Sequence, residues 1–341
     1  MRIAIATDAW SPQVNGVVTT LGQTRDHLVK EGHEVFMVTP ENRRTFPCPT
    51  YPEIRLTLFQ GRAIARELDE FEPDCVHIAT EGTIGLSVRR YCLKRGSPFT
   101  TAYHTQFPEY VRARFPIPVN WTVALLRWFH RPATRTMVPT EGMRKTLLER
   151  GFEDVVIWSR GVLTDVFRPD DPIEYEFDGP IWVYVGRVAV EKNIEAFLDL
   201  NLPGAKVIIG DGPDRKRLVN AYPNCHFLGY KFGRELARHI AGADVFVFPS
   251  KTDTFGIVML EAMACGVPVA AFPVTGPIDV VRAGETGCLH EDLITACSCA
   301  LELNRWDCRQ YAESRSWGRS TRQFVSHLAP RDTFLAEAKA A

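Results

Sequence analysis

Two acidic residues in the segment PSKTDTFGIVMLEAMACGVPVAA, residues 249–271, have a spacing that suits an extended polar ligand. Asp253 lies in an expected loop and Glu261 two helical turns further along, so their carboxylates could contact opposite ends of one molecule. Glu261 falls inside the apolar run Ile257–Ala264, where a charge needs a partner, and a pair of ribose hydroxyls would supply one. A carboxylate near a helix start is also a common cap, which is the structural alternative for Asp253.

The start of the same helix offers backbone groups to an anion. The first N–H groups of a helix have no partner within it and carry partial positive charge, so they can bind a phosphate. The residues expected to form this helix start are Thr254, Phe255, Gly256 and Ile257.

Two cations in the segment VGRVAVEKN could bind a diphosphate. Arg187 can form bidentate hydrogen bonds with phosphate oxygens, and Lys192 can act as a compact point charge. Gly186 precedes both, directly after a predicted strand. For an arbitrary arginine and lysine, a pair of solvated surface side chains would be the better interpretation, so the assignment depends on the surrounding motifs.

Glycine-containing turns follow two other predicted strands. Asn15 and Gly16 end the loop DAWSPQVNG, where a glycine lets backbone N–H groups approach a phosphate at a helix start. Gly210 and Gly212, in GDGP, follow the run Lys206–Ile209. Each motif is also typical of an ordinary turn, and for Asn-Gly the turn is the better interpretation.

Short apolar runs alternate with helical patterns in the first half of the chain. Ile3–Ala6 reads as a buried strand, residues 18–31 as an amphipathic helix and Glu34–Val38 as the next strand. Further strands are expected at Cys75–Ile78, Phe99–Tyr103 and Thr136–Val138. This alternation predicts a parallel, doubly wound sheet of the α/β class.

The second half repeats the pattern. The polar, Pro- and Asp-rich stretch Arg168–Gly179 is interpreted as a linker. We therefore expect two Rossmann-like domains, residues 1–165 and 166–315, with a ligand in the cleft between two facing sheets. The strands expected in the second half are Ile181–Val185, Lys206–Ile209, Cys225–Leu228, Val245–Pro249 and Val267–Ala271.

The composition is that of a soluble globular protein. Hydrophobic residues make up 45% and charged residues 24% of the 341, which excludes disorder, collagen-like repeats and a coiled coil. No uncharged apolar stretch is long enough to cross a bilayer, and MRIAIATDAW is too short an apolar run for a signal peptide. We expect an intracellular protein that is soluble or peripheral to a membrane.

The cysteines are odd in number and lack CxxC spacings, so we interpret them as reduced cytosolic thiols. Cys297 and Cys299 form a CxC on an expected helix, where side chains two residues apart diverge, and no histidine cluster accompanies them. A structural metal is therefore not expected. The nine cysteines are Cys48, Cys75, Cys92, Cys225, Cys265, Cys288, Cys297, Cys299 and Cys308.

In this order the motifs resemble glycosyltransferase family four of the GT-B fold, over nearly the whole chain. TDAWSPQVNGV resembles the opening strand and loop of that family, GRVAVEKN its arginine and lysine clamp, and DTFGIVMLE its E-x7-E segment, while its GDGP turn is matched. SRSWGRSTRQF resembles the terminal helix that crosses back to the first domain, expected at residues 316–341. Two positions depart, since Asp253 replaces the first glutamate and Leu163 stands where many relatives carry aspartate.

The resemblance implies that the protein transfers a sugar from a nucleotide diphosphate with retention of configuration, without a metal or cofactor. Arg187, Lys192 and backbone amides of the glycine loop would stabilise the diphosphate leaving group. Glu261 would bind the ribose and Asp253 the sugar hydroxyls, while His104, in TAYHTQFPEY, would touch the donor sugar. The glycines and helix-start residues named above would complete the donor site.

The segment 86–135 holds nine basic side chains and Glu109 as its sole acid, which would favour an anionic surface. Its stretch VNWTVALLRWFH reads as an amphipathic helix, and basic and aromatic residues together suit an anionic membrane. The alternative is that Val123, Leu126 and Trp128 belong to the core and the arginines are solvated. The residues assigned to membrane or acceptor contact are Arg112, Arg114, Trp121, Trp128 and Arg131.

The segments FPCPTYPEIRLTL and YHTQFPEYVRARF resemble the sulfolipid synthase and diacylglycerol glycosyltransferase branch. This implies a lipid acceptor such as diacylglycerol, and a peripheral protein on the inner face of the cytoplasmic membrane. A UDP-linked hexose or hexuronic acid is our first expectation for the donor. The second is GDP-mannose, with a glycolipid or saccharide acceptor.

Three other classes of function compete with this interpretation. A dinucleotide oxidoreductase would need G-x-G-x-x-G after the first strand, and DAWSPQVNG does not provide it. A non-catalytic nucleotide-sugar binding protein stays open because of Asp253. Nucleic-acid binding ranks last, because no recognition motif accompanies the basic segment.

Overall fold

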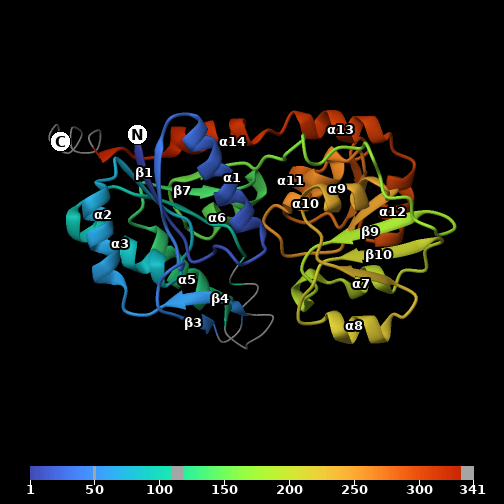
Figure 1. Cartoon of the computed structure of the whole chain (residues 1–341), viewed down its shortest axis with the longest axis horizontal. Coiled ribbons are helices and arrows are strands. Elements are labelled where there is room, and N and C mark those ends of the chain that lie inside the picture. The colour runs from blue at the N-terminus through green and yellow to red at the C-terminus, as the bar shows by residue number, and fades with distance from the viewer. Residues whose placement is uncertain (49–50, 107, 109–117, 332–341) are drawn as a thin grey trace. The chain divides into compact units, whose positions relative to one another are not determined.

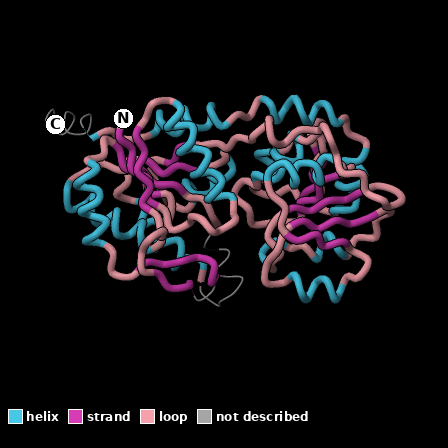
Figure 2. Tube along the Cα trace, viewed as in Figure 1, coloured by secondary structure: helices cyan, strands magenta, loops and turns pink. Residues whose placement is uncertain are grey.

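The chain forms two α/β units in the computed structural model, which describes residues 1–48, 51–106, 108 and 118–331 (Figure 1). Unit 1 comprises Met1–Ser159 together with the chain from Trp317 onward, and unit 2 comprises Arg160–Ser316. The sequence placed the corresponding boundaries after residues 165 and 315. In each unit a layer of strands has helices on both sides (Figure 2).

Unit 1 contains a six-stranded parallel sheet in the order β2-β1-β5-β6-β7-β8. Because all six strands run the same way, the loops that follow them meet at one edge, called here the carboxyl edge of unit 1. The strands are β1 (Arg2–Ala6), β2 (Glu34–Val38), β5 (Cys75–Ile78), β6 (Thr100–Ala102), β7 (Arg135–Val138) and β8 (Val155–Ile157).

Both faces of this sheet are buried, as is usual for parallel strands. Ile3 and Ile5 of β1 belong to a core with α1 and α14, whereas Ala4 and Ala6 belong to one with α2, α3 and the end of α5. The alternation follows from the two-residue period of a strand. The helices of unit 1 are α1 (Gly16–Lys30), α2 (Gly61–Phe71), α3 (Thr83–Arg95), α5 (Val119–His130), α6 (Glu141–Glu149) and α14 (Trp317–His327).

The sequence did not predict an antiparallel hairpin of β3 (Thr45–Cys48) and β4 (Tyr51–Thr57) in unit 1. The end of β4 is fixed to α3, because the backbone N–H of Thr57 donates to the Thr83 hydroxyl at 2.9 Å. The three prolines of this segment obscure a strand pattern, since proline has no N–H for a ladder.

Unit 2 repeats the architecture with a parallel sheet in the order β11-β10-β9-β12-β13-β14. The predicted strand Ile181–Val185 coincides with β9, and the other strand predictions in this half overlap observed strands. The strands are β9 (Ile181–Val185), β10 (Ala205–Ile209), β11 (His226–Gly229), β12 (Val245–Phe248), β13 (Val269–Ala271) and β14 (Gly287–Leu289).

Helices cover both faces of the second sheet as well. Val183 and Val185 of β9 belong to a core with α9, α10 and α13, and Trp182 and Tyr184 to a core with α7, α8 and α12. The helices of unit 2 are α7 (Glu195–Leu198), α8 (Arg215–Ala221), α9 (Gly233–Ala241), α10 (Ile257–Ala264), α11 (Pro277–Val280), α12 (Leu293–Leu301) and α13 (Arg305–Glu313).

The linker predicted at Arg168–Gly179 is wrong, because this stretch lies inside unit 2. It is irregular, but it packs on α9: the Ile173 N–H donates to the Arg238 carbonyl at 2.9 Å, and Arg234 pairs with Asp170 at 2.9 Å. Its prolines and aspartates are therefore those of a fixed surface loop, whose composition resembles that of a mobile linker.

The expectation of reduced thiols is wrong for Cys288 and Cys299, which form a disulfide between β14 and α12. Their Cα atoms lie 6.0 Å apart, within the range that a disulfide spans. The spacing of Cys297 and Cys299 on one helix argued against a metal site shared by these two residues. It gave no information on a disulfide partner for Cys299 in another element. Six further cysteines in the described part of the chain are free thiols.

Candidate active site

The loop after β9 carries Arg187 and, in a short 3-10 helix at Val190–Lys192, the second predicted cation Lys192. Gly186 opens this loop with φ 154°, and a Cβ atom there would lie 2.8 Å from the Tyr184 hydroxyl oxygen. That hydroxyl donates to the Arg187 carbonyl at 2.8 Å. A glycine is therefore required for the chain to fold back over Tyr184 and present Arg187.

The GDGP turn after β10 supports the same loop from the neighbouring strand. The Val188 N–H donates to the Asp211 carbonyl at 2.9 Å. A Cβ atom at Gly210 would lie 2.0 Å from the Gly186 carbonyl oxygen, and one at Gly212 would lie 2.3 Å from that of Val188. The close approach of two backbones thus explains both glycines, while their contact with a donor stays a prediction.

Lys192 and Asp253 come together at the carboxyl edge of unit 2. The Lys192 ammonium donates to an Asp253 carboxylate oxygen at 2.6 Å, and the two side chains are only 20% and 17% exposed. Asn193 joins the same two loops, because its side-chain amide donates to the Pro249 carbonyl at 3.0 Å. Lys192, predicted to bind the diphosphate, and Asp253, predicted to bind the sugar, therefore form one ion pair.

Glu191 lies near Arg187 and was not identified from the sequence. The Arg187 guanidinium lies 4.0 Å from the Glu191 carboxylate, whose side chain is 5% exposed. The Thr252 hydroxyl donates to the Glu191 carbonyl at 3.2 Å, which ties this residue to the loop before Asp253. No local pattern signals this proximity, because Arg187 lies in the loop before the short helix at Val190–Lys192.

The predicted helix is observed as α10, but it begins at Ile257, three residues later than the predicted start at Thr254. Gly256 caps it with φ 80°, and a Cβ atom there would lie 2.8 Å from Met259 Cε. The Phe255 side chain belongs to the core of unit 2, and Thr254 is buried. Contact between Phe255 and a donor would therefore involve its backbone, as would that of Gly256 and Ile257 at the free end of the helix.

Glu261 lies about one helical turn after Ile257 in α10, between apolar residues of the core. It is half-buried, and removal from water raises the pKa of its carboxyl to about 7. Within the described ranges, the structure shows no hydrogen bond or ion pair from this carboxylate to a protein group. A ligand that offers two hydroxyl donors would match the unmet need of this carboxylate.

Asn15 acts as the N-cap of α1 in unit 1. Its side-chain oxygen accepts hydrogen bonds from the N–H groups of Val17 and Val18, both at 3.0 Å. Gly16 is the first residue of the helix. The capping interpretation of this Asn-Gly pair is thus realised in the structure, and donor contact by either residue stays a prediction.

His104 follows β6 at the carboxyl edge of unit 1. Its ring packs edge-on against Trp158, with 5.7 Å between ring centroids, and the residue is half-buried. A partly exposed imidazole held by an aromatic neighbour could contact a ligand at this edge. The predicted contact with a donor sugar stays a prediction.

The residues assigned to membrane or acceptor contact fall on α5 or outside the described residues. The amphipathic helix predicted from VNWTVALLRWFH is confirmed as α5, and Leu126 is in the core as the structural alternative required. Trp128 is not a core residue: it is 52% exposed, and the Arg89 guanidinium lies 4.1 Å from its ring centre. Trp121 is 75% exposed and Arg131 is exposed, while Arg112 and Arg114 lie outside the described residues.

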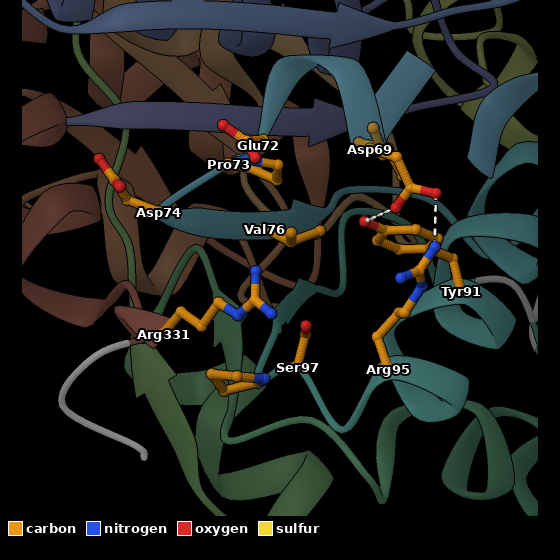
Figure 3. Close-up of a pocket in the computed structure, with 11 residues that line it drawn as sticks. Asp69, Glu72, Pro73, Asp74, Val76, Tyr91, Arg95, Ser97 and Arg331 are labelled. Carbon is orange, nitrogen blue, oxygen red and sulfur yellow. Dashed lines mark hydrogen bonds and ion pairs between the residues drawn. The ribbon is translucent and has the colours of Figure 1, made fainter. Parts of the chain in front are cut away.

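A cavity of about 400 Å³ in unit 1 lies away from these residues (Figure 3). Asp74 and Ser97, which precede β5 and β6, line it, so it is at the amino edge of the sheet. Asp69 in its wall binds the Tyr91 hydroxyl at 2.9 Å and pairs with Arg95. Ligands of doubly wound sheets bind at the opposite, carboxyl edge, so this cavity is not part of the candidate site.

Neither a membrane span nor a metal cluster is found in the part of the chain that the structure describes. No helix there has both the length and the apolar character that a bilayer span requires. No group of three or more His, Cys, Asp and Glu side chains lies together there as metal ligands would.

Comparison with known proteins agrees with the order of the motifs. The family model described as Glycosyltransferase Family 4 matches residues 14–166, and the one described as Glycosyl transferases group 1 matches residues 179–302. A GDP-mannose-dependent alpha-mannosyltransferase of Mycobacterium tuberculosis is 33% identical over 318 residues, 85% of this chain and 83% of that protein. The sulfoquinovosyl transferase SQD2 of Arabidopsis thaliana is 32% identical over 79% of this chain, which spans 60% of that protein.

Two solved structures show the same fold at lower sequence identity. Sucrose-phosphate synthase from Thermosynechococcus elongatus superposes with a TM-score of 0.74 at 19% identity, covering 100% of both chains. Anabaena Alr3699/HepE with UDP-glucose gives 0.70 at 15% identity, covering 96% of this chain and 98% of that one. With its two Rossmann-like units and these relatives, the chain belongs to glycosyltransferase family 4 and is a glycosyltransferase of the GT-B fold.

Proposed function

We propose that this glycosyltransferase moves a hexose or hexuronic acid from a UDP-sugar to a membrane lipid such as diacylglycerol, with retention of configuration and without a metal. The observation that carries the donor half of the proposal is the Lys192–Asp253 pair. It joins the loops after β9 and β12, next to Arg187 and the start of α10. Positive charge for a diphosphate and a carboxylate for sugar hydroxyls therefore lie side by side.

The reaction needs stabilisation of a leaving group and no covalent step on the protein. The bond between the sugar C1 and the diphosphate oxygen breaks, and a bond from C1 to the acceptor oxygen forms. The acceptor proton passes to a donor phosphate oxygen, so no protein base is assigned. Arg187, Lys192 and the N–H groups at the start of α10 stabilise the charge that develops on the diphosphate.

Glu261 recognises the nucleotide through the ribose in this proposal. Its carboxylate needs hydrogen-bond donors, and ribose hydroxyls offer two of them. Because burial raises its pKa to about 7, a substantial share of the carboxyl is protonated at neutral pH without ligand. Hydroxyl donors favour the ionised form, so donor binding should release a proton near pH 7.

A lipid acceptor is supported by the exposed face of α5 and by the relatives. Trp121, Leu125 and Trp128 are 75%, 57% and 52% exposed, and they recur at the spacing of one helical face. Arg127 and Arg131 flank this face. Tryptophan suits the interfacial region of a bilayer and arginine its anionic head groups, so we place the protein peripherally on the inner face of the cytoplasmic membrane.

A GDP-mannose donor, with a glycolipid or saccharide acceptor, is the second candidate. It is favoured by the 33% identical Mycobacterium tuberculosis mannosyltransferase, which covers more of this chain than the sulfoquinovosyl transferase does. Both candidates use the same diphosphate and ribose contacts, so the clamp and Glu261 have the same roles in each. They differ in the base and in the sugar.

One assay with purified protein distinguishes these possibilities. The protein is incubated with UDP- and GDP-sugars together with diacylglycerol in vesicles, and products are identified by mass spectrometry and their anomeric configuration by NMR. A UDP-sugar product with retained configuration, formed equally in EDTA, is the expected result. Donor binding without transfer or hydrolysis would indicate a non-catalytic binding protein, and an EDTA-sensitive rate would contradict metal independence.

A further inference from the structure

The carboxyl edge of unit 1 presents a carboxylate that none of the motifs included. Glu81 follows β5 by three residues. Its carboxylate is hydrogen-bonded to His130 Nε2 at 3.2 Å, and the two side chains are 28% and 1% exposed. Within the described residues, no protein group is hydrogen-bonded to the second carboxylate oxygen. Among the residues that the structure describes, Glu81 therefore has one oxygen fixed by the protein and one available at the edge of the sheet.

The position of Glu81 matches that of His104 on the neighbouring strand. Ile78 of β5 and Thr101 of β6 are paired in the parallel ladder. Glu81 is three residues beyond Ile78, and His104 is three residues beyond Thr101. Both residues therefore belong to loops that leave adjacent strands at the edge where doubly wound sheets bind ligands.

A directed chain of hydrogen bonds holds the Glu81 carboxylate. His130 Nδ1 lies 2.8 Å from the Thr101 hydroxyl, which lies 3.2 Å from the Thr136 hydroxyl. If Glu81 is ionised, His130 Nε2–H donates to it and Nδ1 accepts from Thr101, which in turn accepts from Thr136. Every member of this chain has a partner, so the chain can orient the carboxylate without consuming its second oxygen.

The backbone around Glu81 is fixed as well. Buried Asp8 accepts hydrogen bonds from the Thr80 hydroxyl at 3.0 Å and from the Ile84 N–H at 2.9 Å, on either side of Glu81. A Cβ atom at Gly82 would lie 2.4 Å from the Asp8 carboxylate, so only glycine fits there. A polar group on a preorganised turn loses little entropy when it binds a ligand.

We propose that Glu81 binds a hydroxyl group of the acceptor and that His130 is the positioning residue that holds Glu81 in place. This assignment rests on the proposed function and narrows its acceptor class. An ionised carboxylate accepts hydrogen bonds but repels phosphate, so the part of the acceptor at Glu81 is a neutral polyol such as glycerol or a sugar. A purely structural Glu81–His130 pair would not need a carboxylate oxygen at the ligand-binding edge.

The test compares acceptor kinetics with donor hydrolysis in the same protein. Glu81→Gln keeps the size of the side chain and an oxygen for His130, but it removes the charge and presents an amide in place of the second oxygen. We expect kcat/KM for the acceptor to fall about tenfold or more, because a charge-assisted hydrogen bond is lost. Nucleotide binding and the slow hydrolysis of donor in water should stay at the wild-type level. Glu70→Gln, an exposed glutamate on α2 of the same unit, is the matched control.

His130 is tested by its dependence on Glu81. His130→Phe should lower acceptor kcat/KM, and His130→Gln should restore part of it because the amide can still donate to Glu81. Combining His130→Phe with Glu81→Gln should cost no more than the larger single effect. Additive losses would overturn the positioning role, and melting temperatures would separate it from loss of folding.

The possible outcomes distinguish this assignment from the proposed function. Transfer by the wild-type protein with unchanged acceptor kinetics in Glu81→Gln would overturn the assignment alone. Equal losses of transfer and donor hydrolysis would also overturn it, because Glu81 would then act on the donor. A wild-type protein that neither transfers nor hydrolyses any donor would overturn the proposed function and, with it, the assignment.

Discussion

The carboxyl edges of the two units are held together by different kinds of contact. In unit 2 the loops after β9 and β10 meet through their backbones, at distances that only glycine allows, and an ion pair joins them to the loop after β12. In unit 1 the contacts that hold Glu81 at the edge are made by side chains, those of His130 and Thr101, although Gly82 beside it must also be glycine. Backbone contact constrains residue type severely, whereas side-chain contact permits many solutions. The contacts at the edge of unit 2 can therefore be predicted from a sequence motif, whereas the contacts of Glu81 in unit 1 cannot.

Lys192→Ala should have the largest effect among changes that test this difference. Removing the ammonium leaves the diphosphate without its point charge, and a loss of turnover on the order of a thousandfold is expected. The protein should remain folded, since Lys192 and Asp253 lie in loops at the edge of the sheet and not in the core of unit 2. Steady-state transfer rates and circular dichroism measure the two properties. Lys216→Ala, an exposed lysine on α8, is the control, and near-normal turnover in Lys192→Ala would remove the clamp from the proposal.

Gly210→Ala tests whether backbone contact is what shapes the edge of unit 2. The added methyl group would lie 2.0 Å from the Gly186 carbonyl oxygen, so the two loops must separate. We expect a loss of about 2 kcal/mol or more in the free energy of unfolding, together with lower transfer. Gly22→Ala in α1 is the converse, because nothing lies within 4 Å of its Cβ position, and it should stabilise by about 0.5–1 kcal/mol. Denaturant unfolding of both variants would show no such contrast if the packing argument were wrong.

The pH dependence of donor binding tests the raised pKa of Glu261. Removal from water raises the pKa of the Glu261 carboxyl to about 7, and ribose hydroxyls prefer its ionised form, so donor affinity should rise as pH increases from 6 to 8. Glu261→Gln should bind about tenfold more weakly at pH 8 and lose this dependence. Calorimetric titration with the nucleotide diphosphate gives both numbers. An unchanged pH profile in Glu261→Gln would assign the titration to another group.

Without donor, the contribution of Glu261 to the free energy of unfolding decreases as pH rises, whereas donor affinity increases. The folded pKa of Glu261 is raised above the ordinary value of 4.5, so the folded state binds the proton more tightly than the unfolded state does. Its contribution to stability is complete below about pH 4.5 and is lost as pH rises toward 7. Glu261→Gln should remove this component from the pH dependence of the melting temperature.

Trp121→Ser should have the smallest effect, on membrane association alone. The side chain is 75% exposed, so unfolding free energy should change by less than about 0.5 kcal/mol. Binding to vesicles that contain anionic lipid should weaken several-fold, because the apolar area that enters the interface is lost. Trp306→Ser on α13 is the control, with a tryptophan that is 59% exposed on unit 2. Equal vesicle binding by Trp121→Ser and the wild type would contradict the proposal that α5 contacts the membrane.

The sequence predicted the fold well because the strands of both units are short, apolar and regularly spaced. Three strands were predicted at their observed bounds: Glu34–Val38, Cys75–Ile78 and Ile181–Val185. The last two are buried throughout, and the first ends shortly before a proline. The hairpin at Thr45–Thr57 was missed because its prolines resemble those of a loop. The Cys288–Cys299 disulfide was missed because pairing between elements is not encoded in local spacing.

The residues proposed for the candidate site differ in how far the sequence alone could point to them. Arg187, Lys192 and Asp253 were predicted from the sequence because each lies near a glycine after a strand or near a helix start, and their contact with a donor stays a prediction. Glu191 was not identified, because its approach to Arg187 depends on the course of an irregular loop. Glu81 and His130 are 49 residues apart on a loop and a helix end, so only the fold reveals that they touch.

Asp8 has a consequence for directed evolution of this protein. It fixes the turn around position 81 through Thr80 and Ile84, and a side chain at Gly82 would clash with its carboxylate. The side chain at position 81 can therefore be exchanged on a backbone that stays in place. A small combinatorial library at Glu81 and His130, with Asp8 and Gly82 held constant, is a compact starting point for changing which acceptor the protein accepts.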